Sequence, residues 1–179
     1  MKNFVLIGAT GYIAPRHILA IKQTKNNLLA CIDINLDSSK ILETFDDAKC
    51  YNSFDEFKSF VEEKKDLIDY VVICSPNFLH YDHCSWALQL GLDVICEKPL
   101  TLNYNDLSKL EEYENLYGGK LWSILQLRLH DSIINLKQKS LNLDPKHNMA
   151  VDLTYITPRN KEYLDSWKGD ALKSGGVLV

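Results

Sequence analysis

The sequence NFVLIGATGYIA, residues 3–14, determines how the chain begins to fold. A mostly apolar run at residues 3–7 predicts a strand, and Gly8 and Gly11 predict a turn directly after it. The following segment, from about residue 12 to residue 24, has the apolar spacing of a helix. A strand, a glycine turn and a helix in this order open a β-α-β unit, so we expect a parallel sheet with crossover helices.

Short apolar runs continue to alternate with helix-like segments to about residue 125. The run at residues 70–75 is apolar on both faces, as a central parallel strand is, and it stops at Pro76. We therefore expect a six-stranded, doubly wound parallel Rossmann sheet of the α/β class. The other expected strands are 28–33, 49–51, 93–96 and 121–125, and the other expected helices are 38–44, 56–64 with Ser53 as a cap, one ending near Leu90, and one from Asn103 or Asn105 to Tyr117.

The remainder of the chain has a different pattern. A helix is expected at residues 131–141, followed by a polar loop, an alternating strand at 149–157, and a polar stretch. This segment is too small to bury a core of its own, so it either packs on the first domain or belongs to a larger one. We expect a NAD-binding domain at residues 1–125 and, at residues 126–179, the incomplete start of a second α+β domain for substrate binding and oligomerisation.

Composition excludes several classes of protein. The 179 residues are 46% hydrophobic and 25% charged with a net charge of −4, so a basic face for nucleic acid is not expected. The apolar run at residues 4–7 is too short for a membrane span or a signal peptide. Five cysteines without a CxxC pair indicate a reducing compartment rather than a disulfide framework. We expect a cytoplasmic protein with no membrane and no nucleic-acid partner.

The turn has the spacing GxxGxxA, and it lies where a dinucleotide fold holds the pyrophosphate. Gly8, Gly11, Tyr12 and Ile13 are its expected cofactor-binding residues. Asp33 follows Gly11 by 22 residues (33 − 11), near the offset at which a carboxylate accepts hydrogen bonds from the adenosine ribose. No Arg or Lys lies between Asp33 and Ser39, which favours NAD over NADP as cofactor. The alternative is a capping aspartate at a strand end.

Two polar clusters follow the expected central strands. The sequence SPNFLH occupies residues 75–80 and EKPL occupies residues 97–100, both at carboxyl ends of parallel strands, where ligands bind in open α/β sheets. With this pair the chain resembles the Gfo/Idh/MocA family of NAD(P)-dependent sugar oxidoreductases. The resemblance extends from Gly8 to Gly176.

The resemblance implies roles for individual residues. Lys98 would be the catalytic residue and would point at the reacting sugar hydroxyl, where a desolvated lysine can relay or stabilise a proton. The alternative for Lys98 is an ordinary surface lysine before a proline. The remaining implied cofactor contacts are Ser75, Pro76, Asn77 and His80 at the nicotinamide-side ribose, Glu97 and Lys98 beside the nicotinamide, and Gln126 and Arg128 near the active site; the implied substrate contacts are Arg159, Tyr163, Trp167 and Lys168.

Further motifs, GATGYIAPRH, LQLRLH, DLTYIT and SWKGD with SGG, are similar to bacterial members of the family that oxidise C3 of UDP-N-acetylglucosaminuronic acid for lipopolysaccharide sugars. A nucleotide-sugar substrate and a homo-oligomer are implied. In that family a histidine soon after the SGG motif pairs with the lysine as general base, and here the sequence ends first. We expect a truncated chain that binds NAD weakly and turns over little or nothing, because general-base catalysis is worth about 10²- to 10⁴-fold in rate.

The sequence has features of other classes of protein. A short-chain nucleotide-sugar epimerase also begins with GATGxxG, but it needs a YxxxK pair that this sequence lacks. A non-catalytic, regulatory NAD-binding module is the main alternative, because a fold does not fix its function. His80, His83 and Cys84 share a helix face at metal-compatible spacing, but no fourth ligand is suggested, so no metal is expected. His17 and His130 are expected to be solvated or to cap helices.

Overall fold

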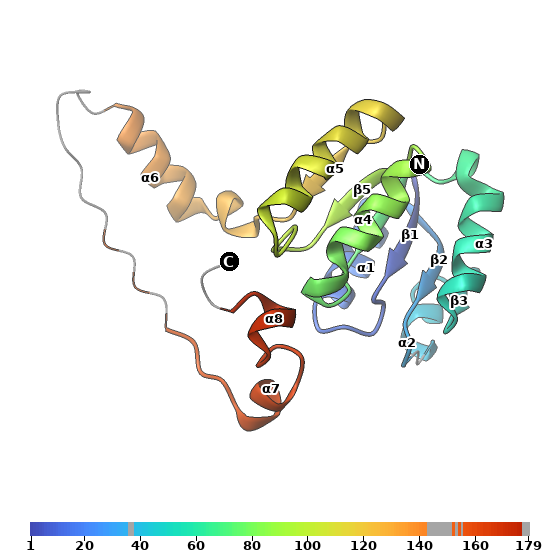
Figure 1. The fold of residues 1–179 in the computed structure, drawn as a ribbon, viewed down its shortest axis with the longest axis horizontal. Coiled ribbons are helices and arrows are strands. Elements are labelled where there is room, and N and C mark those ends of the chain that lie inside the picture. The colour runs from blue at the N-terminus through green and yellow to red at the C-terminus, as the bar shows by residue number, and fades with distance from the viewer. Residues whose placement is uncertain (36–37, 143–151, 153, 155, 177–179) are drawn as a thin grey trace.

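The computed structural model describes residues 1–35, 38–142, 152, 154 and 156–176. Its centre is a six-stranded sheet in which all neighbouring strands are parallel (Figure 1). The strand order β3-β2-β1-β4-β5-β6 reverses between β1 and β4, as in a doubly wound fold. The predicted Rossmann sheet is thus confirmed. The strands are β1 (Asn3–Ile7), β2 (Asn27–Ile32), β3 (Lys49–Tyr51), β4 (Tyr70–Ile73), β5 (Asp93–Cys96) and β6 (Leu121–Ser123).

Helices cover both faces of this sheet, and alternate residues of each strand point to opposite faces. In β1, Val5 and Ile7 belong to one buried cluster, whereas Phe4 and Leu6 belong to the other. The first cluster includes residues of α3 (Phe54–Lys64), α4 (His80–Gln89) and α5 (Tyr104–Tyr117), and the second includes residues of α1 (Ala14–Gln23) and α2 (Ser39–Leu42). Burial on both faces explains why the central strands are continuously apolar.

The ends of several elements differ from the prediction for local reasons. Helix α1 begins at Ala14 rather than at residue 12, because the glycine turn continues to Ile13 and Pro15 occupies the first helical turn. Ser53 caps α3 as predicted, accepting a bond from the Glu56 N–H at 3.4 Å. Asn103, and not Asn105, caps α5, because the Asn105 N–H donates to the Asn103 side chain at 2.9 Å. Short 3-10 turns at η1 (Lys65–Leu67) and η2 (Asn77–Leu79) were not expected.

After β6 the regular elements among the described residues are all helices. They are η3 (Gln126–Leu129), α6 (Asp131–Leu141), α7 (Lys161–Asp165) and α8 (Ala171–Ser174). Helix α6 was predicted at these residues, whereas α7 and α8 were not. The strand predicted at 149–157 falls mainly on residues 149–151, 153 and 155, which lie outside the described residues.

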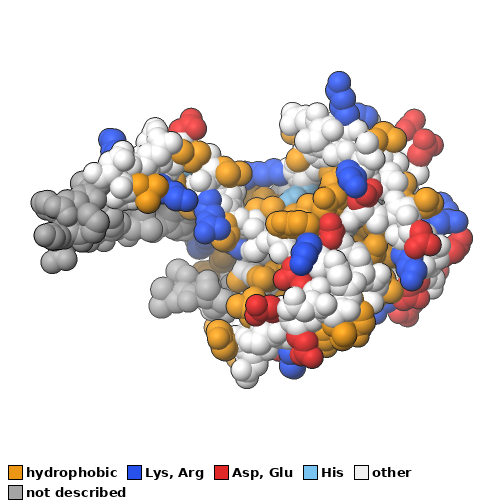
Figure 2. Space-filling view, turned by 90° about the horizontal axis from the view of Figure 1, so that it is seen from above, with side chains coloured by type: hydrophobic (Ala, Val, Ile, Leu, Met, Phe, Trp, Pro, Cys, Tyr) orange, Lys and Arg blue, Asp and Glu red, His pale blue; other side chains and the backbone are white. Residues whose placement is uncertain are grey.

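Two parts of this segment lie differently with respect to the sheet. Helix α6 projects away from it, whereas α8 lies against η2, the turn directly before α4 (Figure 1). Figure 2 shows hydrophobic side chains on the part of the molecule that projects from the sheet. The exposed apolar residues of η3 and α6 include Leu127, Leu129, Leu136 and Leu141. In the described part of the chain, no helix has the length and apolar character needed to cross a membrane.

Candidate functional site

The glycine turn between β1 and α1 is pressed against the end of β4. Gly8 has a φ of +84°, and a Cβ atom there would lie 2.6 Å from the carbonyl carbon of Cys74. Its backbone N–H donates to the Ile32 carbonyl oxygen at 2.9 Å, which joins the turn to β2 as well. Only glycine combines this conformation with so close an approach. The turn therefore lies where three neighbouring strands β2, β1 and β4 end.

The first turn of α1 lies beside the glycine turn and has no acidic side chain of its own. Ile13 precedes the helix and makes no side-chain capping bond, and the first helical turn contains no acidic residue. Arg16 is in that first turn. A cation there is repelled by the positive end of the helix dipole unless an anion binds nearby. An uncapped helix start beside a glycine turn suits a phosphate group, so these residues fit the pyrophosphate of a dinucleotide.

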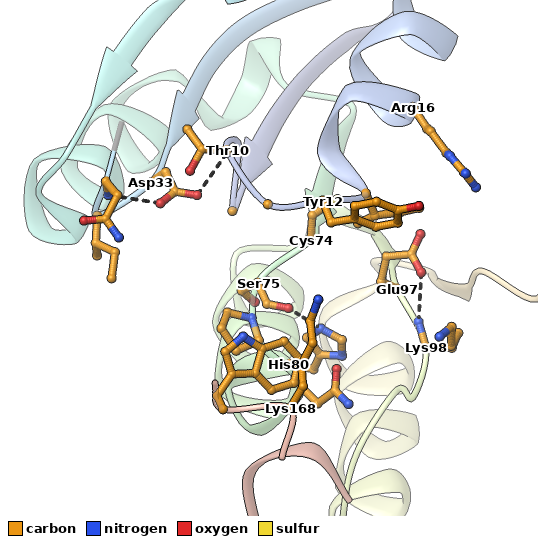
Figure 3. A pocket seen from close by; sticks show the side chains of 18 of the residues that line it. Thr10, Tyr12, Arg16, Asp33, Cys74, Ser75, His80, Glu97, Lys98 and Lys168 are labelled. Carbon is orange, nitrogen blue, oxygen red and sulfur yellow. Dashed lines mark hydrogen bonds between the residues drawn. The ribbon is translucent and has the colours of Figure 1, made fainter. Parts of the chain in front are cut away.

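Asp33 follows β2 and is held by the backbone on both carboxylate oxygens. The Thr10 N–H donates to Oδ2 at 3.0 Å, and the Asn35 N–H donates to Oδ1 at 3.1 Å. Figure 3 shows the Asp33 carboxylate beside the glycine turn, directed toward Thr10. The carboxylate thus has a defined orientation at the edge of the sheet. It lies beside the glycine turn, as the spacing of Gly11 and Asp33 in the sequence predicts.

The segment after β4 is organised by two buried histidines. The ring nitrogens of His80 lie 2.6 Å from the Pro99 carbonyl oxygen and 2.8 Å from the Ser75 carbonyl oxygen, so this side chain joins the segments after β4 and β5. The Ser75 hydroxyl bonds to Nδ1 of His83 at 2.9 Å. Within the described residues, no group of three or more His, Cys, Asp or Glu side chains is arranged to hold a metal.

Burial at His83 makes a testable contribution to stability. Desolvation, with the nearby charges of His80 and Lys58, lowers the pKa of His83 to about 4 from an ordinary 6.5. As the pH falls, His83 is therefore protonated in the unfolded chain before it is protonated in the folded protein. The stabilisation is complete above pH 6.5 and is lost between 6.5 and 4. We expect a loss of roughly 3 kcal/mol across this range.

His83→Gln is the matched variant, because an amide can keep the bond to Ser75 without titrating. Urea unfolding of both proteins at stepped pH measures the effect as the difference between them, which removes contributions from other groups. Parallel stability curves for the two proteins would contradict the assignment to His83.

Glu97 follows β5 and is paired with His17 of α1. The His17 ring nitrogen Nε2 lies 2.9 Å from Glu97 Oε1, and the two side chains are 14% and 10% exposed. The expectation that His17 is solvated or capping is therefore wrong, because it is partly buried and bonded to a residue 80 positions away. His130 does cap a helix, accepting the Ser132 N–H at 3.3 Å. Lys98 is exposed beside Glu97.

A cavity of about 550 Å³ joins these groups. Figure 3 shows Asp33 at one end, Glu97 and Lys98 at the other, and Tyr12 between them. A volume of this size lies within the usual range for small-molecule sites. Its lining contains the expected residues Gly8, Gly11, Tyr12, Ile13, Asp33, Ser75, Pro76, Asn77, His80, Glu97, Lys98, Gln126, Trp167 and Lys168, together with the unexpected Thr10, Arg16, Ile34, Asn35 and Cys74.

Residues near the end of the described chain complete one wall of the cavity. The Asn77 side-chain amide donates to the Ser174 carbonyl oxygen at 2.7 Å, and the rings of Phe78 and Trp167 are 6.5 Å apart. Lys168 Nζ lies 5.8 Å from the centre of the Tyr12 ring. The segment containing α7 and α8 is thus packed against the site rather than on the far face of the sheet.

Three expected site residues do not line the cavity. Arg128 lies in η3, and Arg159 and Tyr163 line a separate recess. In that recess the Arg159 guanidinium stacks 4.4 Å from the Tyr163 ring centre, and Lys168 Nζ lies 5.5 Å from the same ring. Lys168, which lines the cavity, thus connects it to Tyr163.

A glycine turn, a following acid and a cavity at the strand-order switch point define a dinucleotide-binding α/β protein. The chain belongs to the Gfo/Idh/MocA oxidoreductase family with an NAD-binding Rossmann fold, whose family model matches residues 2–124. This agrees with the family expected from the sequence and with its NAD-binding fold.

Individual relatives are longer than this chain. The WlbA (WbpB) dehydrogenase from Thermus thermophilus, solved with NAD and UDP-GlcNAcA, is 38% identical with a TM-score of 0.91 over 98% of this chain and 58% of its own. Glucose-6-phosphate 3-dehydrogenase from Bacillus subtilis (strain 168) is 32% identical over 99% of this chain and 50% of its own length. Inositol 2-dehydrogenase from Renibacterium salmoninarum is 33% identical over 55% of this chain and 29% of its own. The chain thus spans about half the length of the first of these curated relatives.

Proposed function

We propose that this protein is an NAD-dependent dehydrogenase that oxidises a hydroxyl of a nucleotide sugar, specifically C3 of UDP-N-acetylglucosaminuronic acid, for lipopolysaccharide sugars. The observation that carries the proposal is a cavity with Asp33 at one end and Glu97 and Lys98 at the other. The similarity to the Thermus thermophilus WlbA dehydrogenase supports the choice of substrate.

In this proposal the first half of the cavity holds the adenosine diphosphate of NAD. The Gly8 and Gly11 backbone and the uncapped start of α1 bind the pyrophosphate, and Asp33 accepts the ribose hydroxyls. Thr10 and Asn35 already occupy one position on each Asp33 oxygen. The neighbouring side chains Ile34 and Asn35 carry no cation for a 2′-phosphate, so NAD is preferred to NADP.

The second half of the cavity holds the reacting centre. When bound, NAD supplies the hydride acceptor. The Lys98 amine, exposed at this end, meets the sugar hydroxyl and assists departure of its proton as the alcohol becomes a ketone. Lys168 and Trp167 form the opposite wall, and Arg16 adds a cation that suits an anionic substrate. Gln126 lines the same cavity, whereas Arg128, Arg159 and Tyr163 are proposed to contact the ligand only beyond its lining.

The proposal includes a cytoplasmic location and a homo-oligomer. All five cysteines are free thiols in the structure, which suits a reducing compartment. Exposed apolar side chains on η3 and α6 offer a surface that a second copy can cover.

The test is NADH formation with a panel of sugars by the whole protein that contains these residues, with the 179-residue chain assayed beside it. We expect oxidation of UDP-N-acetylglucosaminuronic acid, and a rate about ten- to a hundredfold lower with UDP-N-acetylglucosamine, which lacks the carboxylate that the cations bind. Glucose 6-phosphate and myo-inositol complete the panel. A preference for either of these would overturn the substrate assignment.

Lys98→Met should lower the rate about 10²- to 10⁴-fold, whereas Lys65→Met in η1, exposed and outside the cavity lining, should leave it unchanged. Equal rates in the two variants would exclude Lys98 from the chemistry. Binding of NAD without turnover of any sugar would favour the alternative, a non-catalytic regulatory NAD-binding module.

A further inference from the structure

We propose that His17 is a positioning residue for Glu97, and that the Glu97 carboxylate makes this protein bind oxidised dinucleotide more tightly than reduced dinucleotide. The inference rests on the proposed NAD site and concerns the charge at its second half. It assigns a role to a buried pair that joins α1 to the segment after β5.

The pair has a defined geometry. His17 Nε2 lies 2.9 Å from Glu97 Oε1, and both side chains are largely buried. A carboxylate oxygen only accepts, so the ring N–H of His17 donates. The other oxygen, Oε2, has the backbone N–H of Lys98 at 3.4 Å, a long and weak contact. His17 therefore supplies the stronger of the two bonds that fix the carboxylate.

Glu97 is ionised despite its burial. Desolvation opposes the charge, but the hydrogen bond from His17, with smaller contributions from Lys98, holds the pKa of Glu97 below its ordinary value. A carboxylate on a side chain that is only 10% exposed is weakly screened by water. The site thus contains a fixed negative charge whose position depends on a histidine from another element.

The location of this charge determines which redox form it favours. A dinucleotide lies across the switch point between β1 and β4, and Asp33 marks the adenosine half. The nicotinamide half then lies over β4 and β5, at the end lined by Glu97. The oxidised nicotinamide ring carries a positive charge and the reduced ring is neutral, so a nearby carboxylate stabilises only the oxidised form.

Two cations at the same end, Arg16 and Lys98, act in the opposite direction. A variant that removes only the charge of Glu97 leaves these two cations in place. Glu97→Gln keeps the size of the side chain and an acceptor for His17. Its effect on the two redox forms therefore reports the charge rather than the packing.

The experiment measures dissociation constants of NAD⁺ and NADH by calorimetry for the intact protein at one fixed pH. We expect the preference for NAD⁺ to fall about tenfold in Glu97→Gln. His17→Phe, which removes the donor, should reduce the preference similarly, and His17→Gln, which restores an N–H donor, should recover it. The double variant His17→Phe with Glu97→Gln should match Glu97→Gln alone, because His17 acts through Glu97.

Glu112→Gln on the exposed face of α5 is the control, and it should leave the preference unchanged. Binding of both dinucleotides with an unaltered preference in Glu97→Gln would overturn this inference and leave the proposed function standing. Binding of neither dinucleotide by the unaltered protein would overturn both. A shift in Glu97→Gln without one in His17→Phe would overturn the role of His17 alone, and circular dichroism of each variant separates these results from misfolding.

Discussion

Gly8→Ala is expected to destabilise the protein by about 4 kcal/mol or more, which corresponds to a fall of about 10 °C in Tm. The added Cβ would lie 2.6 Å from the Cys74 carbonyl carbon and 2.7 Å from the Ser75 nitrogen. Both are backbone atoms at the end of the central strand β4, so neither can move without displacing the sheet. The left-handed φ of +84° adds to this cost.

The matched control for this variant is Gly118→Ala. Gly118 has the same φ of +84°, but a Cβ there has no heavy atom within 4 Å. Its substitution should cost only the conformational strain, about 1 kcal/mol. Thermal unfolding of the two variants separates strain from overlap, and equal losses of Tm would show that contact with Cys74 contributes nothing.

Asp33→Asn should weaken NAD binding by about ten- to a hundredfold, as expected for hydrogen bonds to a charged acceptor. Discrimination against NADP should decrease as well, because the carboxylate no longer repels a 2′-phosphate. The asparagine oxygen can still accept one of the two backbone bonds from Thr10 and Asn35, so the turn should remain folded.

Titration calorimetry with both dinucleotides measures this effect. Asp47→Asn is a suitable control, since Asp47 is exposed in the loop before β3 and does not line the cavity. Unchanged affinity for NAD in Asp33→Asn would argue that Asp33 is only a structural residue at a strand end.

Elements whose signals are local could be predicted from the sequence. Strands β1, β3 and β5 occupy the predicted residues, and β1 and β5 do so because each contains a short apolar run bounded by turn residues. Ser53 was recognised as a cap from its position alone. The glycine turn and Asp33 could be paired because their spacing follows from one β-α-β unit.

Interactions between distant segments could not be predicted in this way. The burial of His17 could not be predicted, because the polar face of an isolated helix gives no sign that Glu97 comes to lie beside it. The bond between Asn77 and Ser174 joins residues 97 positions apart. Arg16 was missed because its significance depends on which way the start of α1 faces. Such contacts follow from the assembled sheet rather than from any local pattern.

The two backbone bonds to Asp33 have a consequence for how a ligand would bind. A carboxylate without such bonds samples several rotamers and loses conformational entropy when it binds a ligand. Here Thr10 and Asn35 fix the Asp33 carboxylate in the folded protein, so its conformational entropy is lost on folding and not on ligand binding. In the proposed site the ribose therefore meets a preorganised acceptor, and more of its interaction energy is available as affinity.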